Sequence, residues 1–188
     1  MNTPAHAVVN LALLETRWPR CTWPILAGAV VPDLPMFVFY GWEKLVLDLK
    51  EPQIWRTDYF VSSWQPVIDA LHSFPLIALA LTVALRLRLP RATAFSASLL
   101  VHAVCDFFLH NEDAHRQLFP LSDYRFRGPI SYWDPAHHGT LGSALEVAAV
   151  VVASIALARR HRSIGVRLTL AATALLFVAG WIAFYALR

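Results

Sequence analysis

The C-terminal part of the chain contains twenty consecutive residues without a charge, LTLAATALLFVAGWIAFYAL at positions 168–187. At a rise of about 1.5 Å per residue, a helix of this length spans the roughly 30 Å hydrocarbon core of a bilayer. Only 15% of the 188 residues are charged and 57% are hydrophobic, whereas an ordinary soluble domain carries roughly 25% charged residues. The sequence therefore predicts an integral membrane protein and excludes an ordinary soluble domain.

Five further apolar runs have the length and composition of helices, at about 5–15, 22–42, 67–86, 92–110 and 141–158. Proline interrupts the second run at Pro24, Pro32 and Pro35, which predicts a kinked or broken helix there. We therefore expect an all-α fold: a polytopic membrane bundle of about five to six helices that forms a single domain over residues 1–188.

Two polar connections, 43–65 and 111–139, are rich in Trp, Tyr and Phe, as is typical of segments at a membrane–water interface. If all six runs cross, the opposite side receives nine arginines and a single acid, Glu15. The positive-inside bias places that side in the cytoplasm, so both connections are expected to face the periplasm of a bacterial inner membrane. The net charge of +3 fits this topology and gives no reason to expect a nucleic-acid partner.

Ionisable residues inside the apolar runs gather at the outer level of this topology. The stretch LLVHAVCDFFLHNEDAH, residues 99–115, contains His102, Asp106, His110 and His115. Residues at i, i+4 and i+8 share one helix face, and a His and an Asp on adjacent turns can hold one cation at about 2 Å. A divalent cation would also offset the cost of charge at membrane depth. Other helices contribute to the same layer, so the predicted ligands are His6, Asp33, His72, His102, Asp106 and His110, with zinc as the expected ion.

Each of these residues also has a purely structural interpretation when it is considered alone. His102 and Asp106 could form a hydrogen-bonded structural pair, and His6 could be an interfacial residue. Asp33 or Glu146 could cap a helix, and His137 and His138 could lie in an exposed loop. The convergence of several helices on one layer favours the metal site.

The order of several short motifs resembles that of the YdjM-like family of membrane-bound metal-dependent hydrolases. The motifs are HAVVNLAL, GAVVPDLP, LHSF, LLVHAVCDFF and LFPLSDYRFRGPIS, over about residues 4–146. The resemblance implies a metal site formed by His6, Asp33, His72, His102 and Asp106.

Two departures from the pattern of that family remove possible ligands. The second aspartate of its Pro-Asp-x-Asp motif is Pro35 here, and IDA precedes Leu71 where the family has His-Arg-Gly. The substitutes left open are His110, Asp113, His137, His138 and Glu146.

Two further likenesses are weaker. The opening MNTPAH and the later SYWDPAHHG are similar to those of small bacterial membrane proteins often labelled as CobQ-type cobalamin-biosynthesis proteins, although no nucleotide loop or amidotransferase motif supports that label. The helical His/Asp/Glu layout is similar to that of zinc-dependent phospholipase C.

The first functional hypothesis is a membrane-embedded metal-dependent hydrolase that acts on a lipid or a phosphoester. The metal would lower the pKa of bound water towards about 7, and the candidates for general acid or base are Glu146, Asp134, His137 and His138. The candidates for phosphate binding are Arg116, Arg125 and Arg127, although the favoured interpretation of these three is a snorkelling interfacial role.

The main alternative is a non-enzymatic metal-binding or structural membrane protein whose site is closed and four-coordinate. Proton or ion conduction is disfavoured, because a relay needs polar groups at successive depths and these gather at one face.

Overall fold

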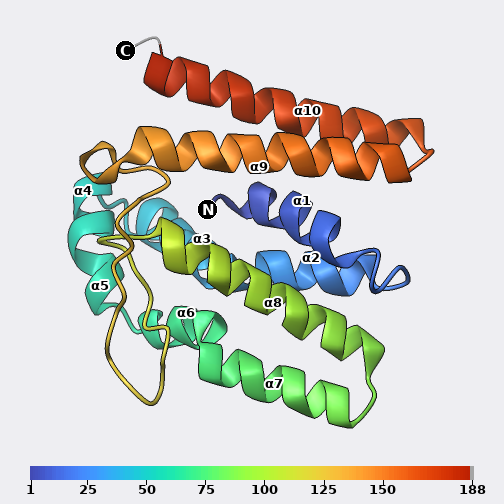
Figure 1. Ribbon diagram of the computed structural model, residues 1–188. Helices are drawn as coiled ribbons and strands as arrows, with labels where there is room; N and C mark the ends of the chain where they lie inside the picture. Colours follow the sequence, from blue (N-terminus) through green and yellow to red (C-terminus); the bar gives the residue numbers. More distant parts are fainter. Residues whose placement is uncertain (187–188) are drawn as a thin grey trace.

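The structure is a computed structural model that describes residues 1–186, and these contain helices and loops but no strand (Figure 1). The α-helices in chain order are α1 (Thr3–Leu14), α2 (Thr22–Val30), α3 (Leu34–Gly41), α4 (Glu51–Gln53), α5 (Tyr59–Val61), α6 (Gln65–His72), α7 (Phe74–Arg86), α8 (Pro90–Leu109), α9 (Gly139–Arg160) and α10 (Ile164–Trp181). The remaining helical turns are Val31–Asp33, Trp42–Val46, Ile54–Asp58, Pro135–His137 and Ile182–Ala186. The all-α prediction is confirmed.

Four helical segments of the described chain are long and apolar enough to cross a membrane: Thr22–Val46, Pro90–Leu109, Gly139–Arg160 and Ile164–Tyr185. The pair α6 and α7 gives a fifth if it counts as one bent span. The first predicted run does not reach this length, because α1 has 12 residues and is therefore only about 18 Å long. The protein is thus a membrane protein by its helices, with four or five helical segments long enough to cross, and α1 is a shorter apolar helix.

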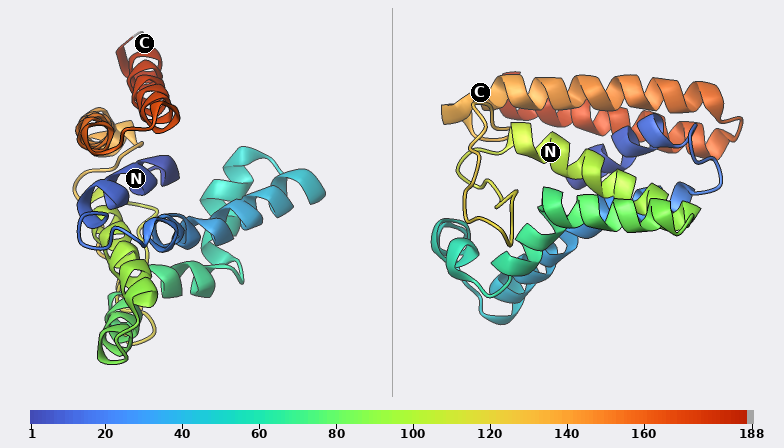
Figure 2. Two further views of the ribbon diagram at one scale, coloured as in Figure 1. Left: turned by 90° about the vertical axis from the view of Figure 1, so that its right-hand side faces the viewer. Right: turned by 60° about the horizontal axis from the view of Figure 1, so that its bottom comes forward.

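Helix α8 lies at the centre of the bundle, where it packs against α2 on one side and α7 on the other (Figures 1 and 2). Helix α1 packs between α2 and α9, and α10 packs on α9. A close approach joins α2 to α8, since a Cβ atom on Gly28 would lie 2.4 Å from the carbonyl oxygen of Phe95. Only glycine allows the two backbones to come this near.

Two of the predicted runs are broken inside the structure. The second run breaks at the turn Val31–Asp33, as its prolines predict. The third run was expected to be continuous, but α6 and α7 meet at an angle of 53°. Ser73 has an extended backbone and its side chain caps α7 by accepting from the Leu76 N–H, while Pro75 has no N–H with which to continue α6. The expectation of a single helix over 67–86 is therefore wrong.

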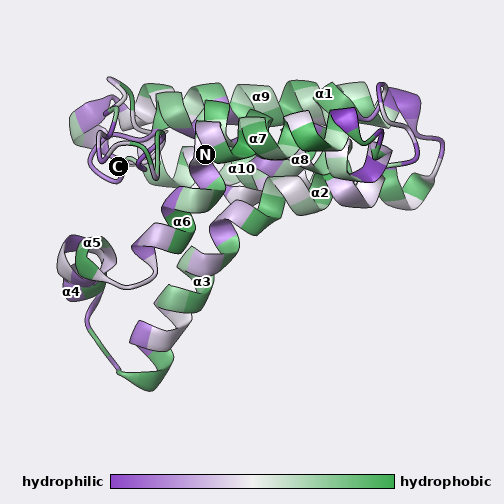
Figure 3. Ribbon diagram, turned by 90° about the horizontal axis from the view of Figure 1, so that it is seen from below, coloured by the Kyte–Doolittle hydropathy of each residue, from purple (hydrophilic) through white to green (hydrophobic). Residues whose placement is uncertain are grey.

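Helices α3 and α6 leave the bundle together and carry α4 and α5 at their far end (Figure 3). We call residues 34–72 the arm. Its own core contains Phe39, Ile54, Tyr59 and Ile68, all at most 5% exposed. The predicted interfacial connection 43–65 is thus partly helical and folded, and the chain joins the arm to the bundle at Asp33 and at His72.

The other predicted connection, 111–139, has one short helical turn and folds across the end of the bundle. The N–H of Gly128 donates to the carbonyl of His110 at 2.8 Å, and the N–H of Tyr132 donates to that of Leu109 at 3.0 Å. This connection and the arm lie at the left-hand end of Figure 1, while the arginine-rich turns 15–21, 87–89 and 161–163 lie at the right-hand end.

Candidate metal centre

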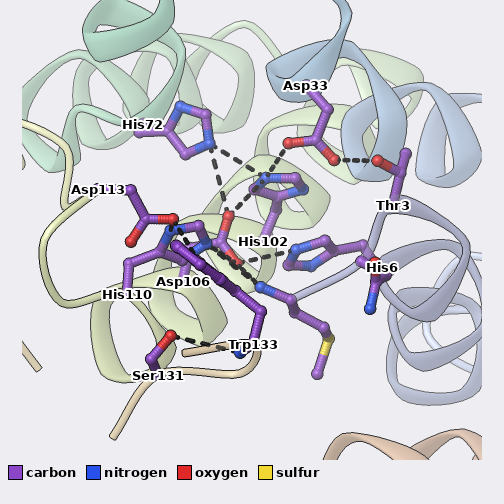
Figure 4. Close-up of polar contacts among 12 residues, drawn as sticks. Thr3, His6, Asp33, His72, His102, Asp106, His110, Asp113, Ser131 and Trp133 are labelled. Carbon is purple, nitrogen blue, oxygen red and sulfur yellow. Dashed lines mark hydrogen bonds and ion pairs between the residues drawn. The ribbon is translucent and has the colours of Figure 1, made fainter. Parts of the chain in front are cut away.

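The centre is built on the last turns of α8, where His102 and Asp106 are both buried, with 0% and 3% of their surface exposed. They lie one helical turn apart, so their side chains point the same way. The Nε2 atom of His102 is 3.1 Å from Oδ2 of Asp106. His102 and Asp106, whose spacing predicted a shared helix face, are therefore in direct contact (Figure 4).

The two ends of the arm bring His72 and Asp33 to the same point. The Nε2 atoms of His72 and His102 are 3.2 Å apart, and His72 Nε2 is 3.6 Å from Asp106 Oδ2. Asp33 Oδ1 lies 3.5 Å from His102 Nε2. We call Asp33, His72, His102 and Asp106 the first site, because one ligand atom from each lies within 4.8 Å of the others.

The remaining ring nitrogens of this site face backbone carbonyls. His72 Nδ1 is 2.7 Å from the carbonyl oxygen of Ile68, and His102 Nδ1 is 2.9 Å from that of Ala29. A carbonyl oxygen only accepts, so each Nδ1 donates a proton to it. In the neutral rings, both Nε2 lone pairs then point at the centre, as in histidines that bind a metal ion.

The second oxygen of Asp106 faces a different set of groups. Its Oδ1 atom is 3.0 Å from His6 Nε2, 3.5 Å from His110 Nε2 and 2.7 Å from the amino group of Met1. His6 is fully buried and stacks on His102 with ring centroids 3.7 Å apart. Four of the other five predicted ligands thus lie within 3.6 Å of the Asp106 carboxylate. His6 is in neither group of residues whose ligand atoms could hold one ion.

His115 joins this cluster although it was not among the predicted ligands. Its ring is 7% exposed and stacks on His72 at 3.8 Å. One ligand atom each from Asp106, His110 and His115 lies within 4.8 Å of the others, and we call these three residues the second site. The sequence offered one signal, the place of His115 in the same His-rich stretch, but it lies beyond the end of α8 and shares no helix face with the rest.

Charged groups outside the spanning helices modify the second site. His110 Nδ1 is 2.9 Å from Asp113 Oδ2, which also accepts from the indole N–H of Trp133 at 3.0 Å. Burial and the amino group of Met1 oppose charge on His110, but the carboxylates of Asp113 and Asp106 outweigh them and raise its pKa to about 9. Burial lowers the pKa of His115 well below its ordinary value, because a low-dielectric surrounding disfavours the charged ring.

The predicted acid and base candidates lie outside these contacts. Glu146 is 3% exposed and accepts hydrogen bonds from the backbone and side chain of Asn2. Asp134 Oδ2 lies 2.6 Å from His137 Nδ1. The hydrogen bond from this ring is the largest of the contributions that lower the pKa of Asp134. His138 adopts a left-handed backbone before α9, with φ of 56°. No hydrogen bond or ion pair within residues 1–186 joins these four to the two sites.

Two of the three candidate phosphate-binding arginines contact a buried carboxylate. Asp69 is 0% exposed and accepts from the backbone N–H of Arg116 at 2.9 Å and from its Nε at 2.6 Å. Arg125 Nη2 lies 3.7 Å from the same carboxylate. These contacts tie the 111–139 connection to α6. Arg127 is exposed and has no polar partner within the described part of the chain.

Comparisons of the chain with models of protein families, with curated proteins and with solved structures find no match. The resemblance to the YdjM-like family thus rests on the order of motifs alone. The donor set supports a metal ion independently of any relative. Imidazole and carboxylate groups suit zinc and other divalent transition metals, and the His/Asp groups of this chain are placed so that they could hold one.

Proposed function

We propose that the protein is a membrane-embedded, divalent-metal-dependent hydrolase whose metal centre includes the first site. One observation carries the proposal: the Nε2 atoms of His72 and His102 lie 3.2 Å apart while their Nδ1 atoms face backbone carbonyls. Two lone pairs so placed repel each other unless a positive charge lies between them.

The carboxylates strengthen the case for a cation. Asp33 and Asp106 add two anionic groups to the same buried space, and each lies within 3.5 Å of His102 Nε2. Unpaired charge in a dry interior costs several kcal/mol. A divalent ion neutralises both carboxylates and binds both lone pairs, which a single shared proton does not.

A bound divalent ion would supply a water of lowered pKa and polarise a carbonyl or phosphoryl oxygen. Around it, Asp33 is the ligand nearest to solvent, with 11% of its side chain exposed, and Thr3 donates a hydrogen bond to its other oxygen. The pair of Asp134 and His137 lies in the connection at the same end of the bundle and is the candidate for proton transfer.

The depth of the centre suggests the substrate. Asp106 is three residues from the end of α8, or about 4.5 Å along the axis, which is close to the level of lipid headgroups. A lipid or another membrane-associated phosphoester would meet the centre there, with Arg127 as the available phosphate-binding cation. The positive-inside bias gives this end a periplasmic orientation, and the YdjM-like order of motifs supports the hydrolase class.

The test measures metal content and hydrolysis in detergent-purified protein loaded with zinc. The probes are bis(4-nitrophenyl) phosphate and vesicles of phosphatidylglycerol and phosphatidylethanolamine. His102→Ala and Asp106→Ala should lose metal and reduce turnover by more than about 100-fold, because even outer-shell changes cost 10- to 100-fold. His161→Ala is the matched control, since this ring pairs with Glu15 at the opposite end. A folded protein that stays metal-free in excess zinc would overturn the proposal.

A second candidate function follows from the number of ligands. The first site offers four protein ligands, which is the number found in closed structural zinc sites. A non-enzymatic metal protein would bind zinc tightly, lose stability on chelation and hydrolyse neither probe. That combination of results would favour it over the hydrolase.

A further inference from the structure

We infer that Asp106 bridges two metal ions, the second of which binds between Asp106, His110 and His115. The inference rests on the proposed function, since it assumes that the first site holds an ion, and it adds a second ion and a new ligand.

The two oxygens of Asp106 are used by different histidines. Oδ2 lies 3.1 Å from His102 Nε2 and 3.6 Å from His72 Nε2. Oδ1 lies 3.5 Å from His110 Nε2, and His6, which is in neither group of ligand residues, lies 3.0 Å from it. A carboxylate with imidazoles gathered at both oxygens suits a pair of ions about 3.5–4 Å apart, the spacing of two-metal hydrolytic sites.

His115 lacks the hydrogen bonds that a buried ring normally makes. It is 7% exposed, and its Nδ1 atom has no hydrogen-bond partner within the described residues. Buried polar atoms are nearly always satisfied, so an exception calls for an explanation. One of its ring nitrogens lies within 4.8 Å of ligand atoms from both Asp106 and His110. An ion bound between these three residues would be coordinated by that nitrogen.

His110 lies between two carboxylates. Asp113 Oδ2 lies 2.9 Å from its Nδ1 atom, and Trp133 donates to the same oxygen. Its Nε2 atom faces Asp106 Oδ1 at 3.5 Å, so a cation beside that oxygen would also contact this ring.

The position already attracts positive charge. The amino group of Met1 lies 2.7 Å from Asp106 Oδ1 and 3.3 Å from His110 Nε2. A divalent ion at this position would displace the ammonium group and take over its contacts.

The two sites differ in the number of ligands. The second has three protein ligands, the number that leaves a coordination position for water in catalytic zinc sites, whereas the first has four. It also borders Asp113, whose side chain is 22% exposed. The second ion is therefore the one placed to bind the substrate.

The experiment counts ions per chain in full-length protein loaded with zinc and freed of excess metal. Wild type and His161→Ala should bind two, and His115→Ala should bind one. Asp106→Ala should lose both. Manganese loading of the wild type adds a readout that needs no variant, because two ions bridged by a carboxylate give an exchange-coupled paramagnetic resonance spectrum.

The outcomes separate the two proposals. If wild type binds one ion, His115→Ala binds the same number, and the manganese spectrum shows no exchange coupling, the second site is overturned and the proposed function stands. No ion in wild type overturns both. If His115→Ala fails to fold, His110→Ala and the manganese spectrum of wild type decide.

Discussion

At the scale of residues, Asp69 and Asp123 bind the same arginine in opposite surroundings. Asp69 is 0% exposed and accepts a hydrogen bond from Nε of Arg116. Asp123 is 91% exposed and accepts one from Nη1 of the same residue at 2.7 Å. A buried partner cannot be replaced by water when it is removed, but an exposed one can. The two aspartates therefore give a matched pair of tests.

We predict that Asp69→Asn lowers the free energy of unfolding by about 3 kcal/mol, as expected when one partner of a largely buried ion pair is lost. Asp123→Asn should change it by less than about 0.5 kcal/mol. Denaturant unfolding in detergent, followed by circular dichroism, measures both values. Equal effects of the two substitutions would show that Asp69 does not anchor the connection.

The sequence could predict some site residues because local geometry determines their arrangement. His102 and Asp106 share a face of one helix, and the helix period is enough to pair them. His115 and the partners of Asp69 depend on how the 111–139 connection folds over α6 and α8. No short-range pattern encodes that path, so the sequence offered Arg116 and Arg125 as candidates for phosphate binding or for an interfacial role and did not predict their contact with Asp69.

At the scale of elements, the contact of α2 with α8 also positions the metal centre. Gly28 lies against Phe95 and Ser98, and the carbonyl of its neighbour Ala29 faces His102 Nδ1 at 2.9 Å. A side chain at position 28 would push the helices apart and disturb the carbonyl that orients this ring. Packing and metal affinity are thus coupled through two adjacent residues.

Gly28→Ala should therefore lower the free energy of unfolding by about 1–3 kcal/mol, the usual cost of overpacking. It should also weaken zinc binding by about 10-fold, since an outer-shell partner is displaced. Gly41→Ala is the control, because a Cβ atom there meets nothing within 4 Å. Thermal unfolding and zinc titration check the pair, and unchanged zinc affinity in Gly28→Ala would contradict the coupling.

The breaks between elements were only partly predictable. Three prolines predicted the break in the second run, but the bend between α6 and α7 depends on the cap that Ser73 provides. The cap matters for the site, because it ends α6 at His72 and lets this ring turn towards His102. A straight helix over 67–86 would not present it in the same way.

At the scale of the whole molecule, most of the arginines lie at the end opposite the metal centre. The turns and helix ends there carry nine arginines and one acid, Glu15, while the 111–139 connection lies at the other end (Figure 1). This separation was predicted from the sequence, and it does not depend on whether α1 crosses.

The proposed periplasmic orientation of the 111–139 connection leads to a labelling prediction. In a variant whose natural Cys21 and Cys105 are alanine, Leu121→Cys should react with a membrane-impermeant maleimide added to spheroplasts, because position 121 is 78% exposed in this connection. Ser163→Cys, exposed in the turn before α10, should react only after the membrane is permeabilised. The reverse order of labelling would place the metal centre in the cytoplasm.

Anomalous scattering would locate a bound ion, in crystals of the zinc-loaded protein measured on both sides of the zinc absorption edge. We expect a zinc-specific peak within about 2–2.2 Å of the Nε2 atoms of His72 and His102 and of a carboxylate oxygen of Asp106. Well-ordered side chains at these three residues with no such peak, in excess zinc, would contradict it.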